Sequence, residues 1–210
     1  MRPNRNTAVR ALIAAVTLCA AGFAFADELA VGAQGPDFKL INVDGKTRSL
    51  ADVAVGKDGK PAAATVVVFT CNNCPFAIAY EPVLLDISKQ YADRNVAFVF
   101  INSNDPKIVP ADSYEKMQER AKEKAYPFPY LFDETQATAK AYGAMVTPHV
   151  YLLDGKGILR YRGRVNDKKD QAEVKSNDLM NALDAMLAGK TVEMAETKAF
   201  GCSIKWKKAS

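Results

Sequence analysis

The feature that most constrains the fold is a pair of cysteines, Cys71 and Cys74, placed between two segments of different periodicity. The segment before the pair, residues 65–70, is a short β-branched apolar run that is typical of a buried strand. Pro75 suits the first turn of a helix, where its missing N–H has no intrahelical partner. The apolar residues that follow share the spacing of one helical face: Tyr80, Val83, Leu84, Ile87 and Tyr91. The two cysteines are therefore predicted to lie where a strand ends and a helix begins.

This placement gives the cysteines a redox character. The unpaired N–H groups and the dipole at a helix N-terminus favour negative charge, so a thiolate there has a lowered pKa. The two residues between the sulfurs let them close a small ring. We therefore expect Cys71 to be the attacking thiolate, exposed at the turn, and Cys74, one helical turn further in, to resolve the mixed disulfide.

Two structural interpretations compete with a redox pair. A permanent disulfide across so short a loop would remove little entropy from the unfolded chain, so it would stabilise the fold weakly. A tetrahedral zinc site would need two further ligands, and the sequence after residue 26 offers only His149 and Cys202 as additional soft ligands. The strand, Cys-x-x-Cys and helix context favours redox chemistry over both, so we predict no metal and no cofactor.

The length of 210 residues suits one domain with extensions, and the first 26 residues are typical of a secretory leader. Its apolar stretch, residues 11–22, is too short and too rich in alanine for a membrane span. Ala24-Phe25-Ala26 supplies the small residues that signal peptidase requires. We therefore predict a signal peptide (1–26), a folded domain (27–188) and a C-terminal extension (189–210). The mature protein would be periplasmic or secreted, with no membrane span.

Removal of the leader changes the charge and the cysteine count. The leader holds three arginines and no acidic residue, so the formal net charge falls from +4 to +1 and gives no argument for nucleic-acid binding. One of the 4 cysteines leaves with it, so an odd number enters a compartment that permits disulfides. The odd thiol is Cys202. Three roles are open for it: a buried core residue, a third redox thiol or an intermolecular bridge.

The rest of the chain alternates strands and helices in an order typical of an α/β fold. Asp112 with Glu115 suggests a capping box for a charged helix. Thr147-Pro148 immediately precedes the second of two predicted hairpins. The predicted elements are a hairpin over residues 37–48, a second central strand over 96–101, a helix over 113–124, and a hairpin over 149–163.

This order, with Cys-x-x-Cys between a central strand and a helix and Thr147-Pro148 before a later hairpin, resembles the thioredoxin superfamily over roughly residues 33–188. More narrowly, residues 69–76 and the terminal Gly-Cys-Ser-Ile-Lys-Trp resemble the redoxin group of alkyl hydroperoxide reductase/thiol-specific antioxidant relatives. The resemblance implies a three-layer α/β fold, in which helices flank a central mixed sheet, with an N-terminal β-hairpin and a C-terminal tail. It also implies that Pro148 is a cis-proline beside the cysteines and that Thr147 contacts the substrate backbone.

The sequence departs from these relatives around the sulfurs. Members of the redoxin group commonly carry histidine before the second cysteine, where this chain has Asn73. Thioredoxin uses a buried acid to deprotonate its second cysteine, and no acid lies in the strand before Cys71. Glu81, seven residues after Cys74 on the same helical face, is a candidate proton acceptor, although an exposed helix glutamate is the simpler interpretation.

The leading hypothesis is an exported thiol–disulfide oxidoreductase. Its partners would be protein or small-molecule thiols and disulfides, together with a thiol protein that donates or accepts electrons. A thiol peroxidase is the first alternative, but neither Cys71 nor Cys74 is preceded by the Pro-x-x-x-Thr/Ser-x-x pattern that polarises a peroxide. A Cu(I)-binding or delivery protein is the second, because two thiolates and the imidazole of His149 suit that ion.

Overall fold

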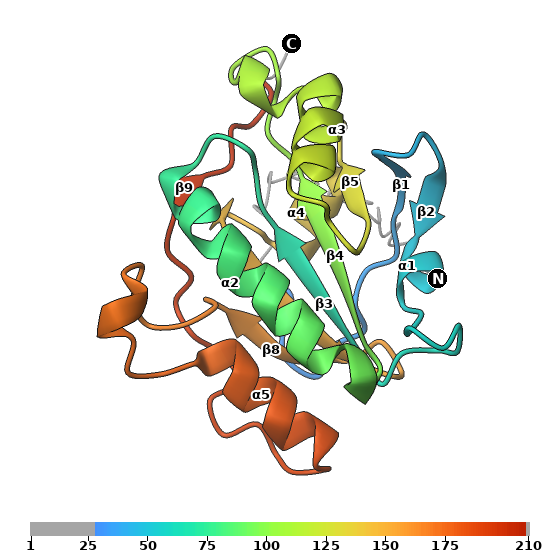
Figure 1. Cartoon of the computed structure of the whole chain (residues 1–210), viewed down its shortest axis with the longest axis vertical. Coiled ribbons are helices and arrows are strands. Elements are labelled where there is room, and N and C mark those ends of the chain that lie inside the picture. Colours follow the sequence, from blue (N-terminus) through green and yellow to red (C-terminus); the bar gives the residue numbers. More distant parts are fainter. Residues whose placement is uncertain (1–27, 209–210) are drawn as a thin grey trace, which may run out of the picture.

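Seven strands form one mixed sheet, in the order β2-β1-β5-β4-β3-β7-β8, in the computed structural model, which describes residues 28–208 (Figure 1). The predicted signal peptide lies outside the described residues. The central strand β3 pairs in parallel with β4 and antiparallel with β7. The strands of this sheet are β1 (Lys39–Asn42), β2 (Thr47–Ser49), β3 (Ala64–Phe69), β4 (Val96–Asn102), β5 (Tyr130–Phe132), β7 (His149–Asp154) and β8 (Leu159–Gly163). A separate antiparallel pair is formed by β6 (Val146–Thr147) and β9 (Cys202–Ser203).

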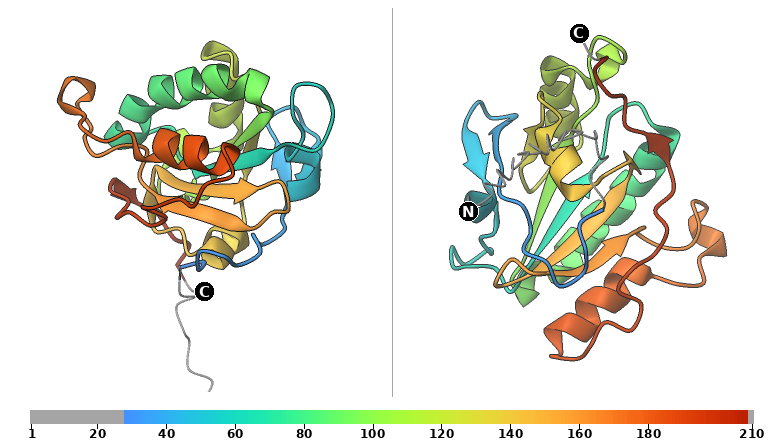
Figure 2. Two further views of the ribbon diagram at one scale, coloured as in Figure 1. Left: turned by 90° about the horizontal axis from the view of Figure 1, so that it is seen from below. Right: turned by 180° about the vertical axis from the view of Figure 1, so that it is seen from behind.

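Helices cover both faces of the sheet, as Figure 2 shows from below and from behind. One face is covered by α2 (Pro75–Tyr91), α3 (Tyr114–Glu123) and α5 (Asp178–Leu187), and the other by α1 (Leu50–Val53) and α4 (Ala137–Tyr142). Three short 3-10 helices connect these elements: η1 (Ala92–Arg94), η2 (Pro110–Asp112) and η3 (Gln171–Glu173). The expected three-layer thioredoxin-like fold is therefore confirmed. No helix within residues 28–208 is long and apolar enough to cross a membrane.

The central strands are apolar on both sides because each side contacts a helical layer. In β3, Val66 and Val68 pack into the core beneath α2 and α5, while Val67 and Phe69 pack into the core beneath α4. This double burial explains why the strand shows no apolar–polar alternation in the sequence. It also makes β3 a rigid base for the cysteine turn that follows it.

The N-terminal hairpin and the helix after the cysteines follow the predictions closely. β1 and β2 pair on either side of Asp44-Gly45, and Gly45 has a φ of 80°, which suits the turn.

The predicted capping box at Asp112 is wrong. Ser113 caps α3 by accepting from the backbone N–H of Lys116, whereas the Asp112 side chain turns inward and is completely buried. Neighbouring amide groups satisfy its carboxylate better than the solvent-exposed end of α3 would.

Candidate active site

The two cysteines lie in the turn between β3 and α2. The backbone N–H of Thr70 still donates to Ile101 in β4, and the helix starts with Cys74 as its N-cap and Pro75 as its first residue. The prediction of a strand–cysteine–helix junction is confirmed. The helix start coincides with Cys74, so the N–H groups of the first helical turn lie closer to this sulfur than to Cys71.

Both sulfurs are buried. Cys71 is 6% exposed and Cys74 is 4% exposed, so the expectation that Cys71 is exposed at the turn is wrong. The side chains of Phe76 and Cys202 pack against the two cysteines and Ala77. Cys202 comes from the end of the chain, and Figures 1 and 2 show that β9 lies beside the start of α2. Cys202 therefore belongs to the packing around the cysteine turn, although it lies far away in the sequence.

Thr147 contacts both cysteines, whereas the resemblance implied contact of Thr147 with the substrate backbone. The Thr147–Pro148 peptide bond is cis, which confirms the expectation of a cis-proline. The Thr147 hydroxyl oxygen lies 3.2 Å from the Cys71 sulfur, and the Thr147 carbonyl oxygen lies 3.3 Å from the Cys74 sulfur. One residue therefore presents a polar group to each sulfur, and the carbonyl accepts a hydrogen bond from Cys74 when that thiol is protonated.

The surroundings of the two sulfurs favour opposite protonation states. The pKa of Cys74 is lowered to about 4, chiefly by a hydrogen bond from the Cys71 thiol and further by the Cys202 thiol and by backbone N–H groups of Ala77 and Cys202. The pKa of Cys71 is raised, first by that hydrogen bond to Cys74, then by burial and by the nearby carboxylate of Asp112. These shifts favour a single negative charge on the pair, with the Cys74 side of the turn better able to hold it. That Cys71 is the attacking sulfur stays a prediction.

Asp112 is a site residue that the sequence analysis assigned to a different role. One of its carboxylate oxygens accepts from the Asn72 backbone N–H at 2.6 Å and from the Asn102 side chain at 3.1 Å. The other accepts from the Asn104 side chain at 2.8 Å. Asn72 lies between the two cysteines, so Asp112 fixes the backbone of the turn. The polar residues that directly follow the apolar strand 96–102 were the available signal, because the carboxyl ends of neighbouring parallel strands share one edge of the sheet.

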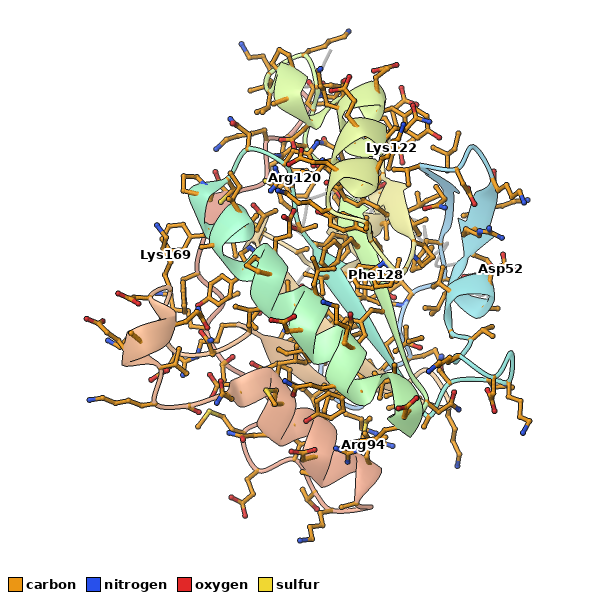
Figure 3. All side chains as sticks on the ribbon, in the orientation of Figure 1. Asp52, Arg94, Arg120, Lys122, Phe128 and Lys169 are labelled. Carbon is orange, nitrogen blue, oxygen red and sulfur yellow. The ribbon has the colours of Figure 1, made fainter. Side chains whose placement is uncertain are left out.

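Glu81, the candidate proton acceptor, is directed toward α3. Its carboxylate accepts from the Arg120 guanidinium at 2.7 Å and from the Tyr126 hydroxyl at 2.5 Å. Figure 3 marks Arg120 between α3 and α2. Glu81 is 8% exposed, so the simpler interpretation of an exposed helix residue is wrong. These bonds make Glu81 part of the contact between two helices, and both of its partners lie away from the cysteine turn.

His149, the candidate copper ligand, begins β7 and packs on the aromatic ring of Tyr151, with ring centroids 4.6 Å apart. Its Nδ1 lies 3.3 Å from the Tyr151 hydroxyl. Burial, with a smaller contribution from Arg162, lowers its pKa to about 4, so the ring is neutral. Within residues 28–208, His, Cys, Asp and Glu side chains form no group of three that could hold a metal ion.

Comparison with known proteins places this site in a family. The sequence matches the AhpC/TSA family over residues 31–162, which is more than half of the chain. The chain belongs to the AhpC/TSA family. The resemblance to the redoxin group of the thioredoxin superfamily is thereby confirmed, and the protein is an oxidoreductase of this class.

Individual relatives of this AhpC/TSA chain agree with that assignment. It is 26% identical over 167 residues to the thiol-disulfide oxidoreductase ResA of Geobacillus thermodenitrificans, which covers 76% of this chain and 88% of ResA. It is 32% identical over 131 residues to the thioredoxin-like protein YneN of Bacillus subtilis, covering 61% of this chain and 68% of YneN. The crystal structure of an uncharacterized conserved protein from Geobacillus kaustophilus is similar with a TM-score of 0.79 and 41% identity, covering 86% of this chain and 94% of that one.

The AhpC/TSA match ends before the C-terminal residues that contact the cysteine pair. It includes Cys71, Cys74, Asp112 and the Thr147–Pro148 bond, but it ends at residue 162. Cys202 lies forty residues beyond that limit and yet contacts the same sulfurs. The site therefore combines a family centre with a thiol supplied from outside the matched segment.

Proposed function

We propose that the protein is an exported thiol–disulfide oxidoreductase whose redox centre is the Cys71–Cys74 pair. The observation that carries this proposal is the contact of both sulfurs with each other and with Thr147 at the start of α2. A dithiol held in this way can close to a disulfide without movement of the strand or the helix. The relatives named as thiol-disulfide oxidoreductases support the same class of reaction.

In the reducing direction, Cys71 attacks a substrate disulfide and its proton passes to the Cys74 thiolate. The substrate S–S bond breaks, one substrate thiolate leaves, and a mixed disulfide joins Cys71 to the substrate. Cys74 then gives this proton to the substrate thiolate that left and attacks the Cys71 sulfur, which releases the second substrate sulfur as a thiolate and closes the Cys71–Cys74 bond. The substrate gains two electrons and the pair loses two; the oxidising direction is the reverse. Cys74 takes the role of proton acceptor that the sequence suggested for Glu81.

The roles of the other groups follow from their contacts. Thr147 would orient the incoming sulfur through its hydroxyl, and its carbonyl would hold the proton on Cys74 during the first step. Partners would be protein or small-molecule thiols and disulfides, with a second thiol protein as electron donor or acceptor. The leader of residues 1–26 supports action in the periplasm or outside the cell, where disulfides persist.

Reduction of insulin disulfides by the mature protein, with dithiothreitol as the reductant, tests this function. Cys71→Ser should lower the rate to that of dithiothreitol alone, and Cys74→Ser should accumulate a mixed disulfide on Cys71. Ser203→Ala is a matched control, because Ser203 is an exposed neighbour of the site. Full activity in Cys71→Ser, or catalysis no faster than dithiothreitol in the wild type, would refute the proposal.

A further inference from the structure

The end of the chain forms part of the cysteine site. We call residues 195–206 the C-terminal segment. Within it, Cys202 pairs antiparallel with Thr147 and Ser203 pairs with Val146. The backbone N–H of Ile204 extends this pairing by donating to the carbonyl of Met145 at 2.9 Å. The chain has therefore placed its own strand, β9, along the edge that carries the cis-proline and beside the start of α2 (Figure 1), where Cys202 packs against the cysteine pair.

A glycine permits this close approach. A Cβ atom on Gly201 would lie 2.0 Å from the Thr147 carbonyl oxygen and 2.7 Å from its carbon, and both are backbone atoms that cannot turn away. Any larger residue at position 201 would push the C-terminal segment off the site. In the Gly-Cys dipeptide, Gly201 allows the backbone to approach Thr147 closely, and Cys202 places a thiol beside that contact.

Contacts on both sides of Cys202 anchor the C-terminal segment. Before it, the Thr197 backbone N–H donates to the Arg162 carbonyl at 3.0 Å. After it, the Lys205 backbone N–H donates to the Asn104 side chain at 2.8 Å, and Ile204 is buried in the core beneath α4. Asn104 also binds Asp112, so the anchor of the C-terminal segment and the support of the cysteine turn share one residue. Cys202 is thus held at a defined position.

The three thiols form one cluster with different access to solvent. Cys202 packs against the cluster formed by Cys71, Cys74 and Ala77, and its thiol and backbone N–H help to lower the pKa of Cys74. All three cysteines are reduced in this structure. Cys202 is partly exposed, whereas the other two are buried. Burial, followed by the neighbouring Cys74, raises the pKa of Cys202, and Lys205 and Lys169, the latter beside the start of α2 (Figure 3), oppose this rise.

We propose that Cys202 is a third redox thiol, which exchanges with the Cys71–Cys74 disulfide by attacking the Cys74 sulfur. The proposal rests on the redox pair of the proposed function and adds a further reacting residue to it. The Cys202 sulfur loses its proton and forms a bond to Cys74, while the Cys71–Cys74 bond breaks and Cys71 leaves as a thiolate that takes up a proton. One disulfide is exchanged for another, so no external oxidant or reductant is needed.

This exchange would make the disulfide of the buried pair accessible to thiols in solution. Cys71 and Cys74 are buried and Cys202 is partly exposed, so a Cys74–Cys202 disulfide would bring one oxidised sulfur to the accessible residue. An external thiolate can attack Cys202 there and receive the oxidising equivalents without unfolding the turn. The substrate class at this position is a small or flexible thiol, because the strand edge at Thr147 is already paired with the segment itself.

Disulfide mapping of the Cys71→Ser variant tests the proposal. The variant is oxidised with diamide, quenched with an alkylating reagent in acid, and digested for mass spectrometry without reduction. We expect an intramolecular Cys74–Cys202 disulfide in the monomer. The matched control carries Cys71→Ser, Cys202→Ser and Ser203→Cys, which moves the thiol to the opposite face of β9. The bond should form at least about tenfold more slowly in the control, because only Cys202 is already in contact with Cys74.

The outcomes separate this inference from the proposed function. Equal rates in the variant and its control, or no intramolecular bond in Cys71→Ser, would overturn the role of Cys202 even if the wild type still forms a Cys71–Cys74 disulfide. Absence of a Cys71–Cys74 disulfide from oxidised wild type would instead contradict the redox pair. In the wild type we expect both the Cys71–Cys74 and the Cys74–Cys202 peptides, and Cys202→Ser should retain only the first.

Discussion

Cys71 and Cys74 are separated by two residues, yet their surroundings have opposite effects. The Cys74 side of the turn offers N–H groups, the helix start and a neighbouring thiol, all of which stabilise a thiolate. The Cys71 side offers burial and the carboxylate of Asp112, which both oppose a negative charge. These effects add to the hydrogen bond between the two cysteines, which is the largest influence on the pKa of each. The Cys-x-x-Cys spacing alone would not distinguish the two sulfurs.

Replacement of Cys74 should have the largest effect on the ionisation of the cysteine pair. In the reduced wild type, the pKa of about 4 for Cys74 predicts one thiolate at a pH well below the ordinary cysteine value of about 8.5. Cys74→Ser should abolish the thiolate absorbance in the ultraviolet between these two pH values, whereas Cys202→Ser should keep most of it. Persistence of the thiolate signal in Cys74→Ser would mean that Cys71 carries the charge.

The same shift predicts a pH dependence of stability. The depressed pKa of Cys74 contributes stability that is lost as the pH falls from the unfolded pKa of about 8.5 through about 4, whereas the raised pKa of Cys71 lowers stability only above about 8.5. The free energy of unfolding of the reduced wild type should therefore fall more over this range than that of Cys74→Ser. Denaturant titrations at several pH values measure the difference, and parallel curves would contradict it.

Displacement of the C-terminal segment should have the next largest effect. Gly201→Val places a side chain against the Thr147 backbone, so the segment should lift and expose both sulfurs. Alkylation should accelerate at least about tenfold, the factor that corresponds to about 1.4 kcal/mol of opening free energy. The pKa of Cys74 should rise, because the Cys202 thiol and N–H no longer contact it. Ser203→Val, on the exposed side of the same strand, is the control and should change neither property.

Removal of the charge on Asp112 should have a smaller effect on the chemistry. Asp112→Asn leaves one acceptor oxygen for three N–H donors, so it should destabilise the fold by about 1–3 kcal/mol. It should also lower the pKa of Cys71, because the opposing carboxylate is gone. Glu81→Gln is the matched control: it removes a buried carboxylate that binds Arg120 and should leave the alkylation profile of Cys71 unchanged. Equal shifts in both variants would rule out a specific role for Asp112.

The sequence was sufficient to predict the central strands and the cysteine junction, because each depends on local patterns, and the cis-proline was implied by the resemblance to the thioredoxin superfamily. Apolar runs specify β3 and β4, and Pro75 marks the helix start to within one residue. The errors concern contacts between residues far apart in the sequence. Asp112 carries a local capping signal that a buried amide cluster overrides, and the cysteine pair packs against Cys202, which lies about 130 residues away in the sequence. That segment is short and lacks periodicity, so only its Gly-Cys dipeptide could have signalled the contact.

A redox titration of the wild type tests the central claim most directly. The mature protein is equilibrated in dithiothreitol buffers of graded potential, quenched in acid, and mapped by mass spectrometry. We predict one reversible two-electron transition, in which the disulfide that forms contains Cys74 and joins it first to Cys71. Failure to reach a reversible equilibrium, or an oxidised state in which Cys74 remains a free thiol, would contradict the account.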